Sequence, residues 1–299
     1  MSTPQIRPDR STQKLGFGKW LARVGWRHLV AIVAVVFAAF PLVYVLSASL
    51  NPHGTLTGSN TLFTTFSLEN YQRLLSDPIR PYGRWYANTL FIAGTTAVVT
   101  VLLGAMAAYA FSRLRFKGRR PGLMSLLLIQ MFPQLLMVVA IFLLLSALGD
   151  VIPALGIGSS IALILVYLGG ALGTNTYLMY GFFNTVPMAL DEAAKVDGAG
   201  HARIFFTIIL RLVAPILAVV GLLSFVATFN EYVVASVVLG NDPNHNTLAI
   251  GLYQYVSSEF NTYWQVFAAG AVLAALPVLV LFLWLQKYIV SGLTVGAVK

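Results

Sequence analysis

Six long apolar runs alternate with shorter polar segments along the chain. They cover residues 29–50, 85–111, 123–148, 159–180, 212–239 and 264–289. Each run is close to or above the roughly 20 residues that an α-helix needs to cross a hydrocarbon layer about 30 Å thick. The first run is longer than the hydrophobic region of about 7–15 residues in a cleaved signal peptide, so we interpret it as a retained span. The pattern predicts an all-α membrane protein whose six transmembrane helices occupy residues 29–289.

Segment 185–215 mixes polar and apolar positions between the fourth and fifth runs. Pro187 suits the first turn of a helix, where its missing N–H would be unpaired anyway. Gly198 suits a helix end, because glycine tolerates left-handed backbone geometry. Between them the spacing places an apolar set on one helix face and a charged set on the other: Leu190, Ala193 and Ala194 against Asp191, Glu192 and Lys195. With a second helical run over 201–210, the segment predicts a helix–turn–helix elbow between two spans.

Composition supports a membrane protein and narrows its chemistry. Hydrophobic residues make up 58% of the 299 residues and charged residues only 10%, against about 25% charged in soluble domains. The chain has no cysteine, which excludes disulfides and thiolate metal sites. Its net charge of +9 does not favour nucleic-acid binding, because the basic residues flank the apolar runs instead of covering one face of a soluble domain.

Basic residues are distributed unequally between the two sides of the predicted membrane. Sixteen Lys and Arg fall in segment 1–28, in the turn between the second and third runs, in segment 185–215 and near the end of the chain. The other connectors hold three, which are Arg73, Arg80 and Arg84. Cytoplasmic loops carry the excess of basic residues in membrane proteins. We therefore predict that the basic segment 1–28, the elbow and the tail 290–299 are all cytoplasmic.

Part of segment 185–215 resembles a known motif. The motif consists of EAA at 192–194, then three residues before Gly198, then nine residues before Ile208, with Leu210 shortly after. This pattern is similar to the EAA loop of ABC importer permeases. Arg211 departs from the pattern, since the family usually has proline there, and Pro215 follows four residues later. The resemblance implies that the elbow docks into a groove on a separate ATPase subunit. The implied coupling residues are Glu192, Ala193, Ala194, Asp197 and Gly198. Without the resemblance, the segment is an amphipathic cytosolic linker.

Polar side chains inside the apolar runs need hydrogen-bonding partners, because hydrocarbon supplies none. Gln130 and Gln134 flank Pro133 in the third run. They either cover the backbone carbonyl that Pro133 leaves free or line a solute path. Asn230 and Glu231 form a polar patch in the fifth run, either on that path or as a hydrogen-bonded buttress against a neighbouring helix. The six runs hold no further acid or histidine, so coupling to protons is not predicted.

Two smaller patterns concern packing and the edge of the membrane. Gly169 and Gly173 stand four residues apart in the fourth run, a spacing that favours close helix packing over a binding role. An aromatic cluster precedes the last run: Tyr253, Tyr255, Phe260, Tyr263 and Trp264. It is either an interfacial aromatic belt or a contact with a sugar or its carrier, since flat apolar rings suit the C–H faces of a pyranose.

Three further stretches resemble the smaller permease of maltose/maltodextrin importers: QMFP at 130–133, YLGG at 167–170 and GLTVGAVK at 292–299. This resemblance implies that the tail reaches into the ATPase dimer, through Thr294, Gly296 and Lys299. It also implies that the connector 241–255 enters an extracytoplasmic sugar-binding protein, through Asn241, Asn244, Tyr253 and Tyr255.

Patterns of catalysis and nucleotide binding are missing from the sequence. There is no G-x-x-x-x-G-K-[ST] loop for ATP, and the four histidines at 28, 53, 201 and 245 form no readable metal site. We expect no enzyme activity and no cofactor in this chain, with ATP and Mg bound by the partner ATPase.

The hypothesis is a permease subunit of the bacterial plasma membrane that imports an oligosaccharide. The resemblance implies three protein partners: a second permease of six or more spans, an ATPase dimer and the sugar-binding protein. The alternatives are a permease for trehalose or glycerol phosphate, a secondary transporter, and a membrane scaffold without transport function.

Overall fold

The computed structural model describes residues 18, 21–52, 62–240, 242–257 and 263–295, and every regular element in this part of the chain is helical. The predicted all-α class is therefore confirmed. The α-helices are α2 Trp26–Ser49, α3 Glu69–Ser76, α4 Tyr82–Arg113, α5 Arg119–Gln130, α6 Gln134–Val151, α7 Ser160–Phe183, α8 Met188–Val196, α9 His201–Arg203, α10 Leu210–Leu212, α11 Ala214–Phe229, α12 Val233–Leu239, α13 Leu248–Ser257 and α14 Trp264–Val295. The described residues also form the π-helical turns η2 Leu21–Gly25 and η4 Ile204–Ile209 and the 3₁₀ turn η3 Pro153–Leu155.

Four helices within the described residues, α2, α4, α7 and α14, are long and apolar enough to cross a membrane unbroken. Two further spans are bent pairs: α5 and α6 meet at 98°, and the His201–Leu212 segment meets α11 at 80°. Counting each pair as one span gives six. The described residues are thus compatible with the six apolar runs, and the third and fifth runs are each divided into shorter helices.

The break in the third run lies at residues 131–133, between α5 and α6. Pro133 has no N–H to donate to the preceding turn, and its ring disfavours helical geometry at the residue before it. Its own backbone is extended, with ψ of 118°. The fifth run is interrupted twice, at Val213 before α11 and at residues 230–232 between α11 and α12.

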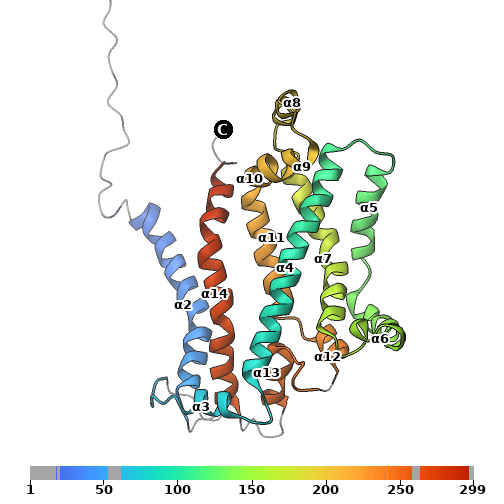
Figure 1. The fold of residues 1–299 in the computed structure, drawn as a ribbon. Helices are drawn as coiled ribbons and strands as arrows, with labels where there is room; N and C mark the ends of the chain where they lie inside the picture. The colour runs from blue at the N-terminus through green and yellow to red at the C-terminus, as the bar shows by residue number, and fades with distance from the viewer. Residues whose placement is uncertain (1–17, 19–20, 53–61, 241, 258–262, 296–299) are drawn as a thin grey trace, which may run out of the picture.

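Helix α4 lies at the centre of the molecule, where it packs against α7 and α11. Helix α14 packs against α2 and α11 (Figure 1), and the outward face of α2 is exposed along its whole apolar stretch. The turn 114–118, helix α8 and the end of α14 gather at one end of the bundle, which we call the elbow end. Helices α3 and α13 lie at the opposite end.

At the opposite end, α3 and α13 are fastened to α4 and α14 by a buried aromatic core. Trp85 is fully buried there, and its ring stands edge-on to Tyr255 with 6.3 Å between centroids. Gly251 allows this close approach, because a Cβ at that position would lie 2.0 Å from a ring carbon of Trp85. The short helix α13 is therefore part of the packed domain.

Candidate functional site

Helix α8, the first half of the elbow, has sharp boundaries that its sequence explains. Pro187 stands just before it, in an extended conformation, so the helix begins one residue later than the sequence suggested. Gly198 has φ of +78°, a left-handed conformation in which glycine carries no Cβ penalty. A Cβ at Gly198 would meet nothing within 4 Å, so the requirement for glycine comes from the backbone and not from space. The predicted turn at Gly198 is confirmed.

The buried face of α8 differs from the predicted one. Asp191 and Ala194 are buried, whereas Leu190 and Ala193 are exposed. The prediction failed because it placed the acidic residues together on the solvent face, and the structure supplies a buried cation for one of them. Glu192 stays on the exposed face.

That cation is Arg113, the last residue of α4. Its Nε lies 2.9 Å from Oδ2 of Asp191, and each side chain is only 5% exposed. The Nε–H does not point along the line between the two atoms, so the contact is an ion pair without a linear hydrogen bond. Arg113 also donates from Nη2 to the backbone carbonyl of Val186 at 2.7 Å, and its Nη1 lies 2.9 Å from the sulfur of Met188. Sequence reasoning missed this pair because Arg113 was counted among the basic residues of the turn.

The last turn of α4 also contacts the chain on both sides of α8. Ser112 donates from its hydroxyl to the Asn184 side-chain oxygen at 2.8 Å, before α8. The Tyr109 hydroxyl lies 3.5 Å from Nδ1 of His201, after α8. The end of α4 therefore supports the elbow at its entry, on α8 itself and at its exit.

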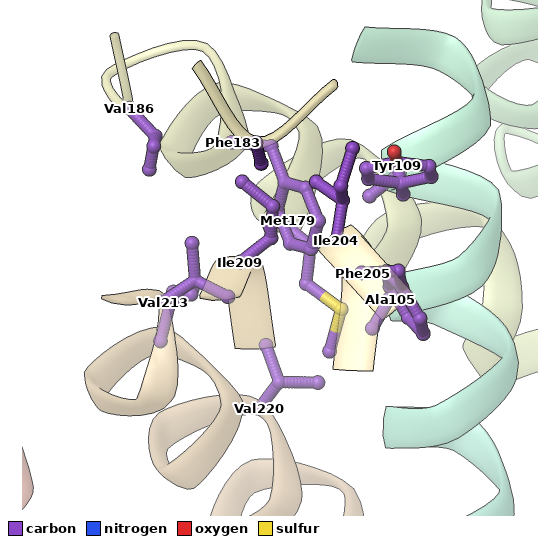
Figure 2. Packing of buried hydrophobic residues seen from close by; sticks show 13 residues of the cluster. Ala105, Tyr109, Met179, Phe183, Val186, Ile204, Phe205, Ile209, Val213 and Val220 are labelled. Atoms are coloured by element: carbon purple, nitrogen blue, oxygen red, sulfur yellow. The ribbon is translucent and has the colours of Figure 1, made fainter. Parts of the chain in front are cut away.

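The second half of the elbow packs into a hydrophobic core shared with α4 and α7. Ile204, Phe205 and Ile209 are buried against Tyr109 and Met179, as Figure 2 shows. The predicted helical run 201–210 is confirmed as helical, but residues 204–209 form a wider π-helical turn. The chain then bends by 80° at Val213 before α11, in which Pro215 occupies the first turn. The exit after Arg211 thus lies one turn later than the family pattern would place it.

Gln130 joins α5 to α7. Its Nε2 donates to the Gly170 carbonyl at 2.7 Å, and the Thr174 hydroxyl donates to its Oε1. A Cβ at Gly173 would lie 2.4 Å from the same Nε2, so this glycine makes room for the glutamine. The carbonyl that Gln130 covers belongs to α7 and is not the one freed by Pro133. The side chain of Gln134 lies outside the part of the chain that the structure describes.

Glu231 stands in the break between α11 and α12, where it caps α12. Its carboxylate accepts hydrogen bonds from the N–H groups of Val234 at 2.8 Å and Ala235 at 2.9 Å. The Tyr167 hydroxyl of α7 donates to it at 2.6 Å. These contacts are those of a buttress between elements. Asn230 is exposed, and its side chain bonds back to the Val226 carbonyl at 2.9 Å.

The connector after α12 is fastened to the start of α4. Arg84 donates to the Asn244 side-chain oxygen at 2.7 Å, and Trp85 donates from its indole N–H to the Pro243 carbonyl at 2.7 Å. The Asn244 N–H donates to the Asp242 carboxylate, and this bond lowers the pKa of Asp242. Asn241 lies outside the described residues.

Of the two tyrosines that follow, Tyr253 is 52% exposed and Tyr255 only 1%. Tyr255 is therefore a core residue of this fold, and burial raises the pKa of its hydroxyl. Tyr253 packs at the surface against Tyr232, with 4.8 Å between ring centroids.

A cavity of about 710 Å³ lies between α4, α11 and α14. Its lining is almost wholly apolar and includes Val98, Val101, Phe225, Pro277 and Trp284. A polar solute needs hydrogen-bonding groups to replace its water, so this cavity does not fit such a solute. Among the described residues, no group of three or more His, Asp or Glu is placed to hold a metal ion.

At the end of α14, the helix runs to Val295, so its backbone includes Thr294. The Thr294 side chain lies outside what the structure describes, as do Gly296 and Lys299. The implied tail contacts therefore have no structural counterpart here.

Comparisons with a protein family, with curated proteins and with solved structures agree with one another. Residues 100–295 match the family described as "Binding-protein-dependent transport system inner membrane component". The chain is 40% identical over 272 residues to the galactooligosaccharides transport system permease protein GanQ of Bacillus subtilis (strain 168), covering 91% of this chain and 93% of that protein. It is 38% identical over 288 residues to the maltose/maltodextrin transport system permease protein MalG of Escherichia coli (strain K12), covering 93% and 96%.

The maltodextrin transport system permease protein MdxG of Bacillus subtilis (strain 168) is 38% identical over 272 residues, with coverage of 91% and 95%. Among solved structures, a bacterial ABC transporter involved in the import of the acidic polysaccharide alginate superposes with a TM-score of 0.75. That match covers 93% of this chain and 99% of the solved chain at 24% identity, and it supports the fold.

Proposed function

This chain belongs to the family of binding-protein-dependent transport system inner membrane components, and from that premise we propose that it is the smaller permease subunit of an ATP-driven oligosaccharide importer of the maltose/maltodextrin type. The observation that carries the proposal is identity of 38–40% to oligosaccharide permeases over more than nine tenths of both chains. The subunit works in a bacterial plasma membrane with a second permease of six or more spans. It moves sugar, while a separate ATPase dimer hydrolyses ATP.

Helix α8 is the proposed contact with the ATPase. It projects from the elbow end of the bundle (Figure 1), and Glu192, Ala193 and Asp197 lie on its exposed side. Ala194 turns inward and packs the helix onto the domain. Gly198 lets the chain reverse immediately after the helix, so that a short rigid element can enter a groove. The tail residues Thr294, Gly296 and Lys299 are proposed as a second ATPase contact on the resemblance alone.

The sugar-binding protein is proposed to dock at the opposite end. Asn244 and Tyr253 are exposed there on segments that α4 holds in place. Because Tyr255 is buried, its part is to support this surface through Trp85. With this arrangement both termini are cytoplasmic and the connector 241–255 lies on the outer side of the membrane, which the distribution of basic residues supports.

The solute path is proposed to pass Gln130, Gln134, Asn230 and Glu231. Gln130 and Glu231 already hold helices together through hydrogen bonds, so they shape the path more than they bind sugar. The large cavity of this chain is apolar, and the sugar site therefore needs polar groups from the second permease subunit.

Uptake by the reconstituted complex tests the proposal. The full chain, its second permease, the ATPase and the binding protein are placed in vesicles, and uptake of radiolabelled maltodextrin is measured with and without ATP. ATP-dependent maltodextrin uptake is expected. Uptake of galactooligosaccharide alone would shift the substrate to that class, which the similarity to GanQ also favours. Uptake driven by a proton gradient without the ATPase would overturn the proposal.

A further inference from the structure

We propose that Arg113 and Asp191 are positioning residues that clamp the coupling helix α8 to the end of α4, so that a movement imposed on α8 passes directly into the central helix of the bundle. We call this contact the Arg113–Asp191 clamp. The proposal rests on the proposed function of α8 as the ATPase contact, and it concerns the next step, which is how the movement enters the membrane domain.

Burial gives the clamp its strength. Both side chains are 5% exposed at a separation of 2.9 Å. In such surroundings the attraction between two charges is far stronger than at an exposed surface, and loss of one partner leaves the other buried and unpaired. The ion pair between Arg73 and Glu69 at the opposite end is a useful contrast, because its side chains are 57% and 42% exposed and salt screens such pairs.

The clamp fixes the orientation of α8 as well as its position. The planar guanidinium of Arg113 reaches Val186 before the helix, Met188 at its first residue and Asp191 one turn later. Three contacts from one rigid group along the first turn prevent α8 from rotating about its axis or sliding along α4. The exposed side that carries Glu192 therefore keeps a fixed direction relative to α4.

The route into the bundle is shorter through the clamp than along the chain. After α8 the chain passes the left-handed Gly198, a π-helical turn and an 80° bend at Val213 before it reaches α11. Through the clamp, α8 reaches α4 directly, and α4 packs against both α7 and α11. Packed helices with internal hydrogen bonds move as rigid bodies, so α4 is the element that follows α8 first.

A distance measurement on the chain alone tests the clamp without any partner. The chain has no cysteine, so spin labels can be placed at Val196→Cys on α8 and at Lys117→Cys in the turn after α4. The clamp predicts a narrow distribution of label distances that broadens in Arg113→Gln and in Asp191→Asn. The matched control is Glu192→Gln, which removes a neighbouring exposed carboxylate and leaves the distribution narrow. An unchanged distribution in both clamp variants would overturn the proposal.

The same variants in the assembled complex test the transmission. The two single substitutions break one contact, so the double variant Arg113→Gln/Asp191→Asn loses no more than either single one. Each of the three variants is expected to retain the ATPase subunit but to transport maltodextrin at least tenfold more slowly than the unchanged protein. If a single variant does not accumulate in the membrane, Arg113→Met/Asp191→Leu replaces it, with the same expectation. Normal transport by any assembled clamp variant would contradict the proposal.

Glu192→Ala separates this inference from the function on which it rests. This variant is expected to lose the ATPase subunit while its label distances stay narrow. If it instead keeps the ATPase and transports normally, the assignment of α8 as the ATPase contact fails, whatever the clamp variants show. If it loses the ATPase while the clamp variants transport normally, the assignment stands and the clamp fails.

Discussion

Replacing Gly173 and Gly169 of α7 by alanine, one at a time, is expected to change stability in opposite directions. Both glycines lie on the same helix four residues apart, so the change in chemistry is the same. A Cβ at Gly169 would meet nothing within 4 Å. A Cβ at Gly173 would lie 2.8 Å from the Leu126 carbonyl oxygen and 2.4 Å from Nε2 of Gln130.

These distances determine how much each substitution changes the free energy of unfolding. Alanine is favoured over glycine inside a helix by about 0.5–1 kcal/mol, and this is the whole effect at Gly169. At Gly173 the carbonyl is backbone and cannot rotate away, so α5 must shift from α7 at an overpacking cost of about 1–3 kcal/mol. Gln130 must also give up its bonds to Gly170 and Thr174, worth about 0.5–1.5 kcal/mol each. After the roughly 0.5–1 kcal/mol gained from the helix preference is subtracted, the net loss of unfolding free energy for Gly173→Ala is about 1–5.5 kcal/mol.

The assay is thermal unfolding of the purified full chain in detergent, followed by the loss of monodisperse protein. Gly169→Ala should unfold at or above the temperature of the unchanged protein, and Gly173→Ala clearly below it. Equal unfolding temperatures for the two variants would show instead that α5 is free to move away from α7 and that Gln130 contributes nothing to packing.

Three further outcomes are expected. Glu231→Gln should keep transport. Glu231→Ala should lower the free energy of unfolding by about 1–3 kcal/mol through lost capping, which is measured as a lower unfolding temperature. Loss of transport in both variants would favour a role on the path. Gly198→Ala forces a Cβ into left-handed geometry at about 1–2 kcal/mol and should reduce sugar-stimulated ATP hydrolysis, whereas Gly200→Ala, whose φ is −73°, should not. Neutralising Lys117 and Arg120 should raise the fraction of chains whose C-terminal reporter is extracytoplasmic; an unchanged fraction would mean that other charges fix the orientation.

The sequence was sufficient for the features that depend on local pattern. The four unbroken span-length helices and the two bent pairs among the described residues each overlap one of the apolar runs, and the left-handed Gly198 falls where the helix had to end. The resemblance carried by the elbow is confirmed by the family match and by the oligosaccharide permeases. Such features are set by spacing along the chain, which a single sequence displays in full.

The sequence did not predict features that depend on contacts between segments far apart in the chain. Arg113 and Asp191 lie 78 positions apart, and nothing in the charge pattern of either segment indicates the other. The sequence places Tyr255 in an aromatic cluster at the membrane edge. In the structure it is a core residue, packed against Trp85, whose own position depends on the missing Cβ of Gly251.

Breaks within apolar runs were also missed. Hydrophobicity does not distinguish a straight span from two short helices, and only Pro133 gave a local signal for the bend between α5 and α6. Glu231 marks the break after α11, since a carboxylate can cap the next helix there, but the same residue is compatible with a functional group inside a continuous span.

Site-specific crosslinking shows whether α8 is the element on which the ATPase acts. Val196→Cys places a single thiol on α8 at a residue that is 88% exposed, and Ile79→Cys places one at the opposite end with 75% exposure. In the assembled complex we expect the Val196→Cys chain to crosslink to the ATPase subunit, with a yield that changes when ATP is added. The Ile79→Cys chain is expected to give no such crosslink. A complex that hydrolyses ATP in response to sugar while Val196→Cys gives no ATPase crosslink would contradict the assignment of α8 as the ATPase contact.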